Sequence, residues 1–364
     1  MPTIFDYVNA KEIAAYVTNA PENKMPYLGE TLFPAKKQLG IDLKWIKGSQ
    51  GLPVAISPAN YDAKATLRER IGFKSVQTEM PFFREGMRVG EKDRQEINRL
   101  IQLNNSAYLT PLLNYIFDDI TKLVEGARVQ AERMRMQLLS TGSISISANR
   151  IAYDYDYKFD ATHKFTIANK WDTCGGANDV DGNAAQPDPV EDIRAALDKV
   201  EEDTGNRPTS AICTRTTFNY LLKSNKIRSD MFLTTGTVAT LANVSEQMVK
   251  TYLADKLGLT IAVYTKKYAL LGDDGKATGS YQYFPDNVFT LIPSGNLGST
   301  YFGTTPEEAD LMNGVTDADV SVVNTGIAVA TIKEPHPVNV FTIVSGIFLP
   351  SFENIDSVGI MTVA

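Results

Sequence analysis

Cysteine and histidine are scarce in this sequence of 364 residues, which contains two of each. Cys174 and Cys213 are too few for a disulfide framework and form no C-x-x-C pair, so a reducing compartment is expected. His163 and His336 are too few for a multi-histidine metal site and leave little for a catalytic triad, so both are expected to be structural or surface residues. The sequence therefore excludes a disulfide scaffold and predicts no metal centre.

Membrane, targeting and enzyme motifs are missing as well. The first residues lack the basic and apolar regions of a secretory signal, and the longest apolar stretch, residues 338–349, is shorter than the ~20 residues that span a bilayer. No Walker loop and no G-x-G-x-x-G, G-x-S-x-G or H-E-x-x-H string occurs. Cys174 has no basic partner nearby in the sequence, which favours a buried thiol over a nucleophile. We expect a protein that is not an enzyme, holds no cofactor and has no membrane partner.

What is present is an acidic chain whose charge is unevenly spread. The net charge is −7 and the pI is near 5.1, which argues against a surface that grips phosphate backbones. Residues 1–140 carry 19 basic and 16 acidic side chains, a net charge of +3, whereas residues 141–364 carry 17 and 27, a net charge of −10. Opposite halves could attract each other between copies, and two independently solvated regions explain the charge equally well.

The N-terminal region has little hydrophobic periodicity. Residues 1–40 contain one weak helical stretch, 10–17, and several prolines, so they are predicted to form an arm that lies on another surface. Period-two alternation begins at Ile41, and a second extended run covers residues 74–89. We predict a long projecting hairpin that has little core of its own and needs a surface to rest on.

The clearest element is a long amphipathic helix over residues 111–141, with Thr110 as its cap and one apolar stripe that continues to Gly142. An aromatic hairpin is predicted over 143–159. Residues beyond 188 alternate between helix and strand, and the chain is mostly extended after residue 280. Together these patterns predict an α+β protein. The helices and strands expected in the alternating part are the helices 188–204, 216–223 and 245–257 and the strands 209–214 and 259–264.

The order of these elements and several short strings resemble the phage major capsid proteins of the lambda E type, which have the Hong Kong 97 fold. The strings are spread through almost the whole chain, and their order is the specific part. They are Gly29–Lys37 with Gly40–Asp42 behind it, Met80–Glu85 followed by Glu91–Gln95, Leu291–Pro293, Leu297–Gly298, Tyr301–Glu307, and Leu349–Asn354.

The resemblance implies a subunit with four parts. These are an N-terminal arm at 1–40, an extended β-hairpin loop at 41–83, a peripheral domain at 84–170 and 281–364 with a spine helix at 111–141, and an α/β axial domain at 171–280. It also implies assembly of copies, as hexamers and pentamers, into an icosahedral shell that encloses double-stranded DNA without sequence-specific binding. Further expected partners are a scaffolding protein, a portal and a decoration protein, and the expected location is the virion after assembly in the host bacterial cytoplasm.

Charged residues on the loop and beside the spine are the expected subunit contacts. Residues 84–99 alternate in sign, which fits either a solvated helix or a salt-bridged contact between subunits. The expected interface residues are Arg68, Glu69, Arg70, Arg84, Glu85, Lys92, Asp93 and Arg94. Two alternatives remain: an encapsulin-like nanocompartment shell that encloses an enzyme, and a soluble two-domain hydrolase whose acidic residues converge.

Overall fold

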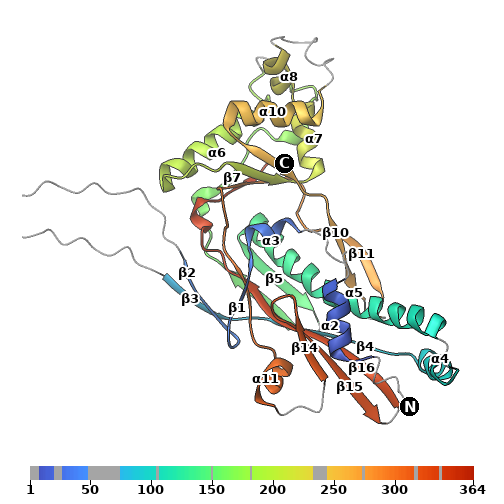
Figure 1. Cartoon of the computed structure of the whole chain (residues 1–364). Helices are drawn as coiled ribbons and strands as arrows, with labels where there is room; N and C mark the ends of the chain where they lie inside the picture. The colour runs from blue at the N-terminus through green and yellow to red at the C-terminus, as the bar shows by residue number, and fades with distance from the viewer. Residues whose placement is uncertain are drawn as a thin grey trace, which may run out of the picture. The chain divides into compact units, whose positions relative to one another are not determined.

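The computed structural model describes residues 8–19, 27–47, 74–103, 106–148, 151–180, 183–232, 244–272, 275–314, 319–335 and 338–364. The chain forms two compact units, each built from separate stretches of sequence. The first unit contains Met1–Trp45, Val76–Arg135 and Gly298–Ser351, and the second contains Ile46–Ser75, Met136–Leu297 and Phe352–Ala364. Figure 1 labels the elements of both units.

The first unit is built around a sheet whose centre is the long strand β16 (Val338–Pro350). The strand order is β1-β13-β16-β15-β14, and β4 (Phe82–Arg88) also pairs with β16. Every pairing is antiparallel except that of β1 with β13. The remaining strands are β1 (Ala35–Lys37), β13 (Thr300–Phe302), β14 (Asp319–Val323) and β15 (Ile327–Pro335).

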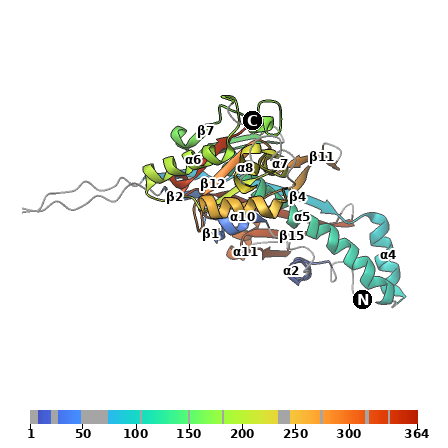
Figure 2. The same cartoon turned by 90° about the horizontal axis from the view of Figure 1, so that it is seen from above.

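Two helices of this unit come one after the other along the chain. They are α4 (Glu91–Gln102) and α5 (Ser106–Thr141), and α4 lies at the N-terminal end of α5 in both views (Figures 1 and 2). Helix α5 begins five residues before the predicted start and includes Pro111. The prediction placed Pro111 in the first turn, where a missing N–H costs nothing, but the residues before it are helical as well. At 1.5 Å per residue the 36 residues of α5 extend ~54 Å.

The described part of the N-terminal arm packs on its own chain. It contains α2 (Ala10–Asn19) and α3 (Leu28–Leu32). Ile13 and Val17 of α2 are buried, and the Ala10 N–H donates a hydrogen bond of 2.7 Å to the Asp319 carboxylate at the start of β14. The arm was expected to lie on another surface, and in the structure that surface is the sheet and helix α5 of the same unit.

The second unit combines a five-stranded sheet with helices. Its strand order is β7-β17-β12-β8-β9, and its core includes Trp171, Phe218 and Phe289. The strands are β7 (Lys164–Thr166), β8 (Ser210–Cys213), β9 (Thr260–Val263), β12 (Val288–Ile292) and β17 (Gly359–Thr362). The helices are α6 (Pro189–Thr204), α7 (Arg215–Lys223), α8 (Asn225–Phe232) and α10 (Glu246–Leu257).

The predicted start signals of these helices are confirmed. The Asp188 side chain accepts a hydrogen bond from the Glu191 N–H, and the Ser245 side chain accepts one from the Met248 N–H, so each caps the N-terminus of its helix. The helices end at Gly205 and Gly258, as the sequence indicates.

Three two-stranded pairs complete the described fold. The predicted aromatic hairpin is β5 (Ser143–Ala148) with β6 (Ile151–Asp156), and a second hairpin is β10 (Lys267–Leu271) with β11 (Ala277–Gln282). Strands β2 (Asp42–Lys47) and β3 (Lys74–Glu79) pair at the base of the predicted extended loop, and residues 48–73 between them lie outside the described part of the chain.

Strand pairing divides the C-terminal region differently from the implied domains. The resemblance placed residues 281–364 in the peripheral part. In the structure β12 pairs with β8, and β17 pairs with β12, so both strands belong to the sheet of the second unit. Their sequences are short and apolar, and such strands carry no signal that says which sheet they join. The peripheral and axial assignments themselves concern the assembled shell and stay a proposal.

Candidate subunit-contact surfaces

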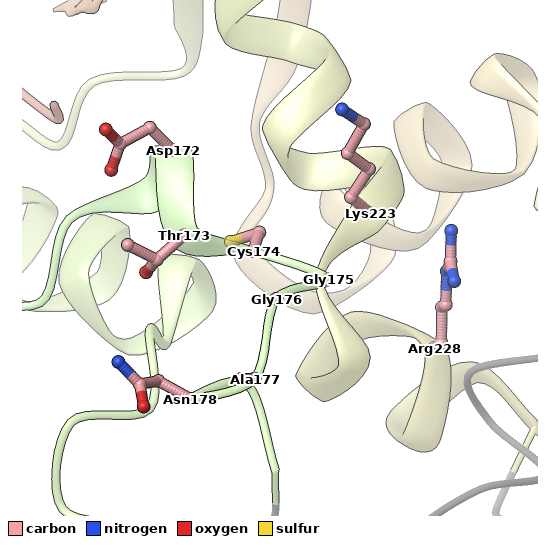
Figure 3. Close-up of a pocket in the computed structure, with 9 residues that line it drawn as sticks. All are labelled: Asp172, Thr173, Cys174, Gly175, Gly176, Ala177, Asn178, Lys223 and Arg228. Atoms are coloured by element: carbon pink, nitrogen blue, oxygen red, sulfur yellow. The ribbon is translucent and has the colours of Figure 1, made fainter.

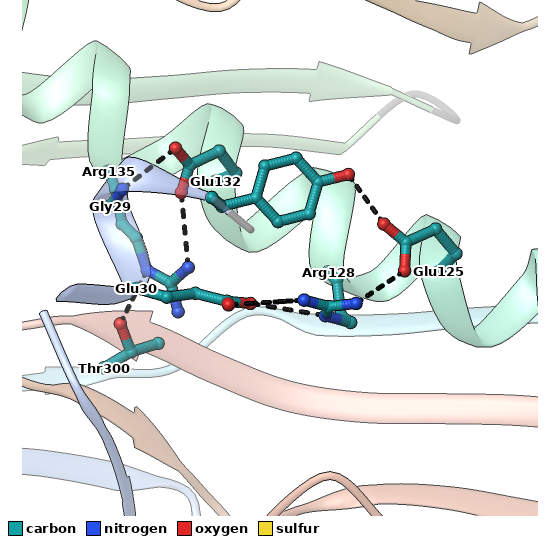
Figure 4. Close-up of polar contacts among 8 residues, drawn as sticks. Gly29, Glu30, Glu125, Arg128, Glu132, Arg135 and Thr300 are labelled. Carbon is teal, nitrogen blue, oxygen red and sulfur yellow. Dashed lines mark hydrogen bonds and ion pairs between the residues drawn. The ribbon is translucent and has the colours of Figure 1, made fainter. Parts of the chain in front are cut away.

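One face of α5 holds the arm through a row of charged side chains. Glu125, Arg128, Glu132 and Arg135 follow one another at spacings of three and four residues, which places them on one side of a helix. They face α3 and the residues next to it (Figure 4). This row is the arm anchor, and it has a buried inner pair and a more exposed outer pair.

The inner pair fixes the backbone of the arm. Glu132 is fully buried and accepts the Gly29 N–H at 3.0 Å, and its carboxylate lies 3.4 Å from Arg135. Arg135 donates to the Thr300 hydroxyl at 2.9 Å, which in turn donates to the Phe33 carbonyl at 3.0 Å. Burial lowers the pKa of Arg135, and the negative charge of Glu132 acts in the opposite direction. Because a lone buried charge is costly, removing either partner should cost ~3–5 kcal/mol.

The outer pair holds side chains of the arm. Arg128 forms ion pairs with Glu30 at 3.1 Å and Glu125 at 2.9 Å, and its guanidinium lies 5.4 Å from the centre of the Tyr27 ring. The Tyr27 hydroxyl donates to Glu125 at 2.7 Å. The arm from Tyr27 to Phe33 is therefore attached to the α5 helix of its own subunit.

Two of the predicted contact residues lie on strand β4, whose residues are nearly all exposed. Arg84 forms an ion pair with Glu307 of the same chain, and the Ser345 hydroxyl donates to Glu307 at 2.8 Å. Burial raises the pKa of Glu307, but the hydrogen bonds from Arg84 and Ser345 outweigh it, so the net shift is downward. Glu85 is exposed beside Arg84.

Three further predicted residues lie on α4, which is held by the buried side chains of Ile97 and Leu100. Arg94 forms an ion pair with Glu91 at 2.7 Å, and its hydrogen bonds lower the pKa of Glu91 to about 2. Lys92 is exposed, and Asp93 is half-buried. The alternating charges therefore lie on a solvated helix and form ion pairs within the chain. A contact between the outward-facing residues of this helix and a neighbouring subunit stays a prediction.

The remaining predicted residues, Arg68, Glu69 and Arg70, lie outside the described residues. Sequence reasoning also missed the arm anchor. The charged spacing along residues 125–135 was a usable signal for one helix face, but the partners Glu30 and Thr300 lie about 100 and 170 residues away in the chain.

A cavity of about 500 Å³ lies in the second unit (Figure 3). Its lining includes the Cys174 thiol, Lys223 and Arg228. Burial raises the pKa of Cys174 to about 12, so the thiol stays protonated and is a poor nucleophile near neutral pH. No histidine lines the cavity, and the described residues contain no cluster of three metal-binding side chains.

The loop beside this cavity is held by a buried aspartate. Asp179 accepts the backbone N–H groups of Gly175 at 2.7 Å and Asn225 at 2.8 Å. These contacts show that Asp179 holds the backbone of the loop in place. Within the described residues no helix is long and apolar enough to cross a membrane.

Comparisons with known proteins agree on one family. The family model of phage major capsid protein E matches residues 9–363. A protein assigned to the capsid of a prophage of E. coli CFT073 is 16% identical, with a TM-score of 0.59 over 98% of this chain and 99% of that chain. A phage-related protein of Bordetella bronchiseptica RB50 is 12% identical, with a TM-score of 0.52 over 97% and 96%. No individually curated protein matches the sequence. The expected α+β capsid fold is confirmed.

Proposed function

The chain belongs to the phage major capsid protein E family, and from this membership we propose that its copies assemble as hexamers and pentamers into the icosahedral head shell of a tailed, double-stranded DNA phage. Family membership makes it a structural protein of the phage head that assembles with itself. We further propose that it has no catalytic activity, that it assembles in the host bacterial cytoplasm with a scaffolding protein and a portal, and that it encloses DNA without binding a specific sequence. A decoration protein on the outside belongs to the same proposal.

The observation that carries this proposal is the extent of the family match. It covers residues 9–363 and therefore runs through both compact units, the arm and the extended loop. An unrelated chain that shared one small domain would match over a fraction of its length. The net charge of −7 also suits a wall that must not hold the genome tightly while the head fills.

The four parts of the subunit enter the proposal with their expected roles. Residues 41–83 form the extended loop that contacts an adjacent subunit through Arg68, Glu69 and Arg70. Residues 171–280, all of which lie in the second unit, supply the axial contacts, and residues 84–170 and 281–364 supply the peripheral ones. Glu85, Lys92 and Asp93 are exposed or half-buried, which suits a peripheral contact.

Electron microscopy of the expressed protein tests the proposal, with and without the products of neighbouring genes. Closed icosahedral particles that contain DNA when the packaging proteins are present support the phage head. Particles that enclose a protein cargo instead indicate a nanocompartment. A monomer or small oligomer with hydrolase activity contradicts both kinds of shell.

A further inference from the structure

A second cavity, of about 450 Å³, lies beside α5 in the first unit. Its lining comes from the helices α2 and α3, the middle of α5, the strands β1, β13 and β15, and the turn between β14 and β15. Its volume is in the range of ordinary binding pockets. The cavity is next to the arm anchor and shares three charged residues with it, namely Glu125, Arg128 and Arg135.

The walls combine apolar surface with accessible negative charge. Apolar side chains come from α2, α5, β13 and β15, namely Val17, Val124, Ala127, Ala131, Phe302 and Ile327. Among the charged side chains that line the cavity, the carboxylates are more exposed than the guanidinium groups: Glu30 and Glu125 are 37% and 25% exposed, and Arg128 and Arg135 are 16% and 3% exposed. Glu30 and Glu125 both pair with Arg128, and their carboxylates stay more accessible to solvent than the two guanidinium groups.

The turn that closes one side of the cavity is strained. Asn324 and Thr325 have φ angles of +47° and +72°. Asparagine tolerates this left-handed region, but a β-branched threonine rarely adopts it. Backbone strain of this kind persists where surrounding structure holds it, often at functional sites. The strained turn is an observation independent of the charges.

We propose that this cavity receives a lysine or arginine side chain from a second copy of this chain. The long aliphatic stem of such a side chain suits the apolar walls, and its charged end suits Glu30 and Glu125. The second copy is the occupant because the family builds its shell from identical subunits, so this inference rests on the proposed function. It adds a specific receptor site to that function.

Filling the cavity tests the inference. Ala127→Phe places a ring in the space that the incoming side chain would occupy. We expect the variant subunit to keep its circular dichroism spectrum, and its yield of particles, measured by sedimentation, to fall at least tenfold. Ala127→Ser is the matched control, because it changes the same position and leaves the space of the cavity open. Normal particle yield from a folded Ala127→Phe protein overturns the inference.

A density map of wild-type particles decides the matter if Ala127→Phe does not fold. We expect a lysine or arginine of a neighbouring copy within hydrogen-bond distance of the Glu30 or Glu125 carboxylate. An empty cavity, or one filled by residues of the same chain or by a different kind of side chain, overturns the inference while the shell proposal stands. If the wild-type protein forms no particles with any of its partners, both fail.

Discussion

At the scale of single residues, the arm anchor shows how one small side chain permits a buried ion pair. A Cβ atom on Gly29 would lie 2.3 Å from the Glu132 carboxylate and 2.7 Å from the Arg135 side chain. Both of those side chains are buried, and Glu132 is bonded to the Gly29 N–H and Arg135 to the Thr300 hydroxyl, so they have little freedom to move away. Gly29 is needed here because of the close approach of two chain segments.

Gly29→Ala should therefore lower the free energy of unfolding by ~1–3 kcal/mol, the usual cost of forcing extra atoms into a packed site. Chemical denaturation of the unassembled subunit measures it. Gly126→Ala on α5 is the control, because its nearest neighbour would be 3.9 Å away and alanine favours a helix by up to ~1 kcal/mol. Equal stability of the Gly29→Ala protein and the wild type would contradict this account of the anchor.

The two thiols give a prediction that depends on pH. Burial raises the pKa of both Cys174 and Cys213 from an ordinary value of 9.0 to about 12. Their contribution to stability is complete below the unfolded pKa, and it is lost as pH rises from there through the folded pKa. We expect both thiols to resist iodoacetamide at about pH 8 in the native protein and to react quickly in denaturant. Rapid alkylation of the native protein would contradict their burial.

At the scale of elements, local signals were predictable and long-range pairings were not. Asp188 and Ser245 mark helix starts because a side-chain cap acts over three residues, and the structure confirms both. The aromatic alternation of residues 153–159 is also a local signal, and it predicted the hairpin strand that the structure shows as β6. The sheet that β12 and β17 join, and the surface on which the arm rests, depend on contacts over tens to hundreds of residues. No short window of sequence contains that information.

Arg84 of β4 was predicted to contact a neighbouring subunit, but in the structure it forms an ion pair with Glu307 of α11 (Pro306–Asn313) in the same chain. A double-mutant cycle with Arg84→Gln and Glu307→Gln measures how strongly the two side chains interact within one subunit. We expect a coupling energy of up to ~1 kcal/mol in the unassembled subunit, because Arg84 is about half exposed. A matched cycle with Arg84→Gln and Glu308→Gln should show much less coupling, because Glu308 pairs with Lys37. Zero coupling would contradict an ion pair between Arg84 and Glu307 within the subunit and would leave a contact with a neighbouring subunit as the role of Arg84.

At the scale of the whole molecule, the described residues form two compact units, and the extended loop at residues 41–83 is a prediction from the sequence. The sequence predicts the loop from its alternation and lack of core, and both its role and the contact residues at its far end remain predictions. The described part of the arm, which was expected to rest on another surface, is buried against its own subunit. Fewer segments of the chain therefore depend on a neighbouring subunit for burial than the sequence indicated.

The double variant Arg68→Glu with Arg70→Glu tests the loop directly. Reversing both charges should weaken the proposed contact, because the adjacent subunit has a net charge of −7, so we expect a folded subunit that does not form shells. Circular dichroism checks the fold, and electron microscopy counts the particles. Exchanging each arginine for lysine is the control that keeps the charge. Particles of normal size and number from the glutamate variant would contradict the proposed contact.

The mass of the purified protein in solution tests whether copies of this chain assemble into a shell. A chain that completes its burial in a shell should sediment as closed particles in the megadalton range, alone or once a scaffolding protein is added. The subunit of 40.0 kDa should then be a minor species. A protein that stayed at the mass of a single subunit in every buffer, with every neighbouring gene product present, would contradict the account.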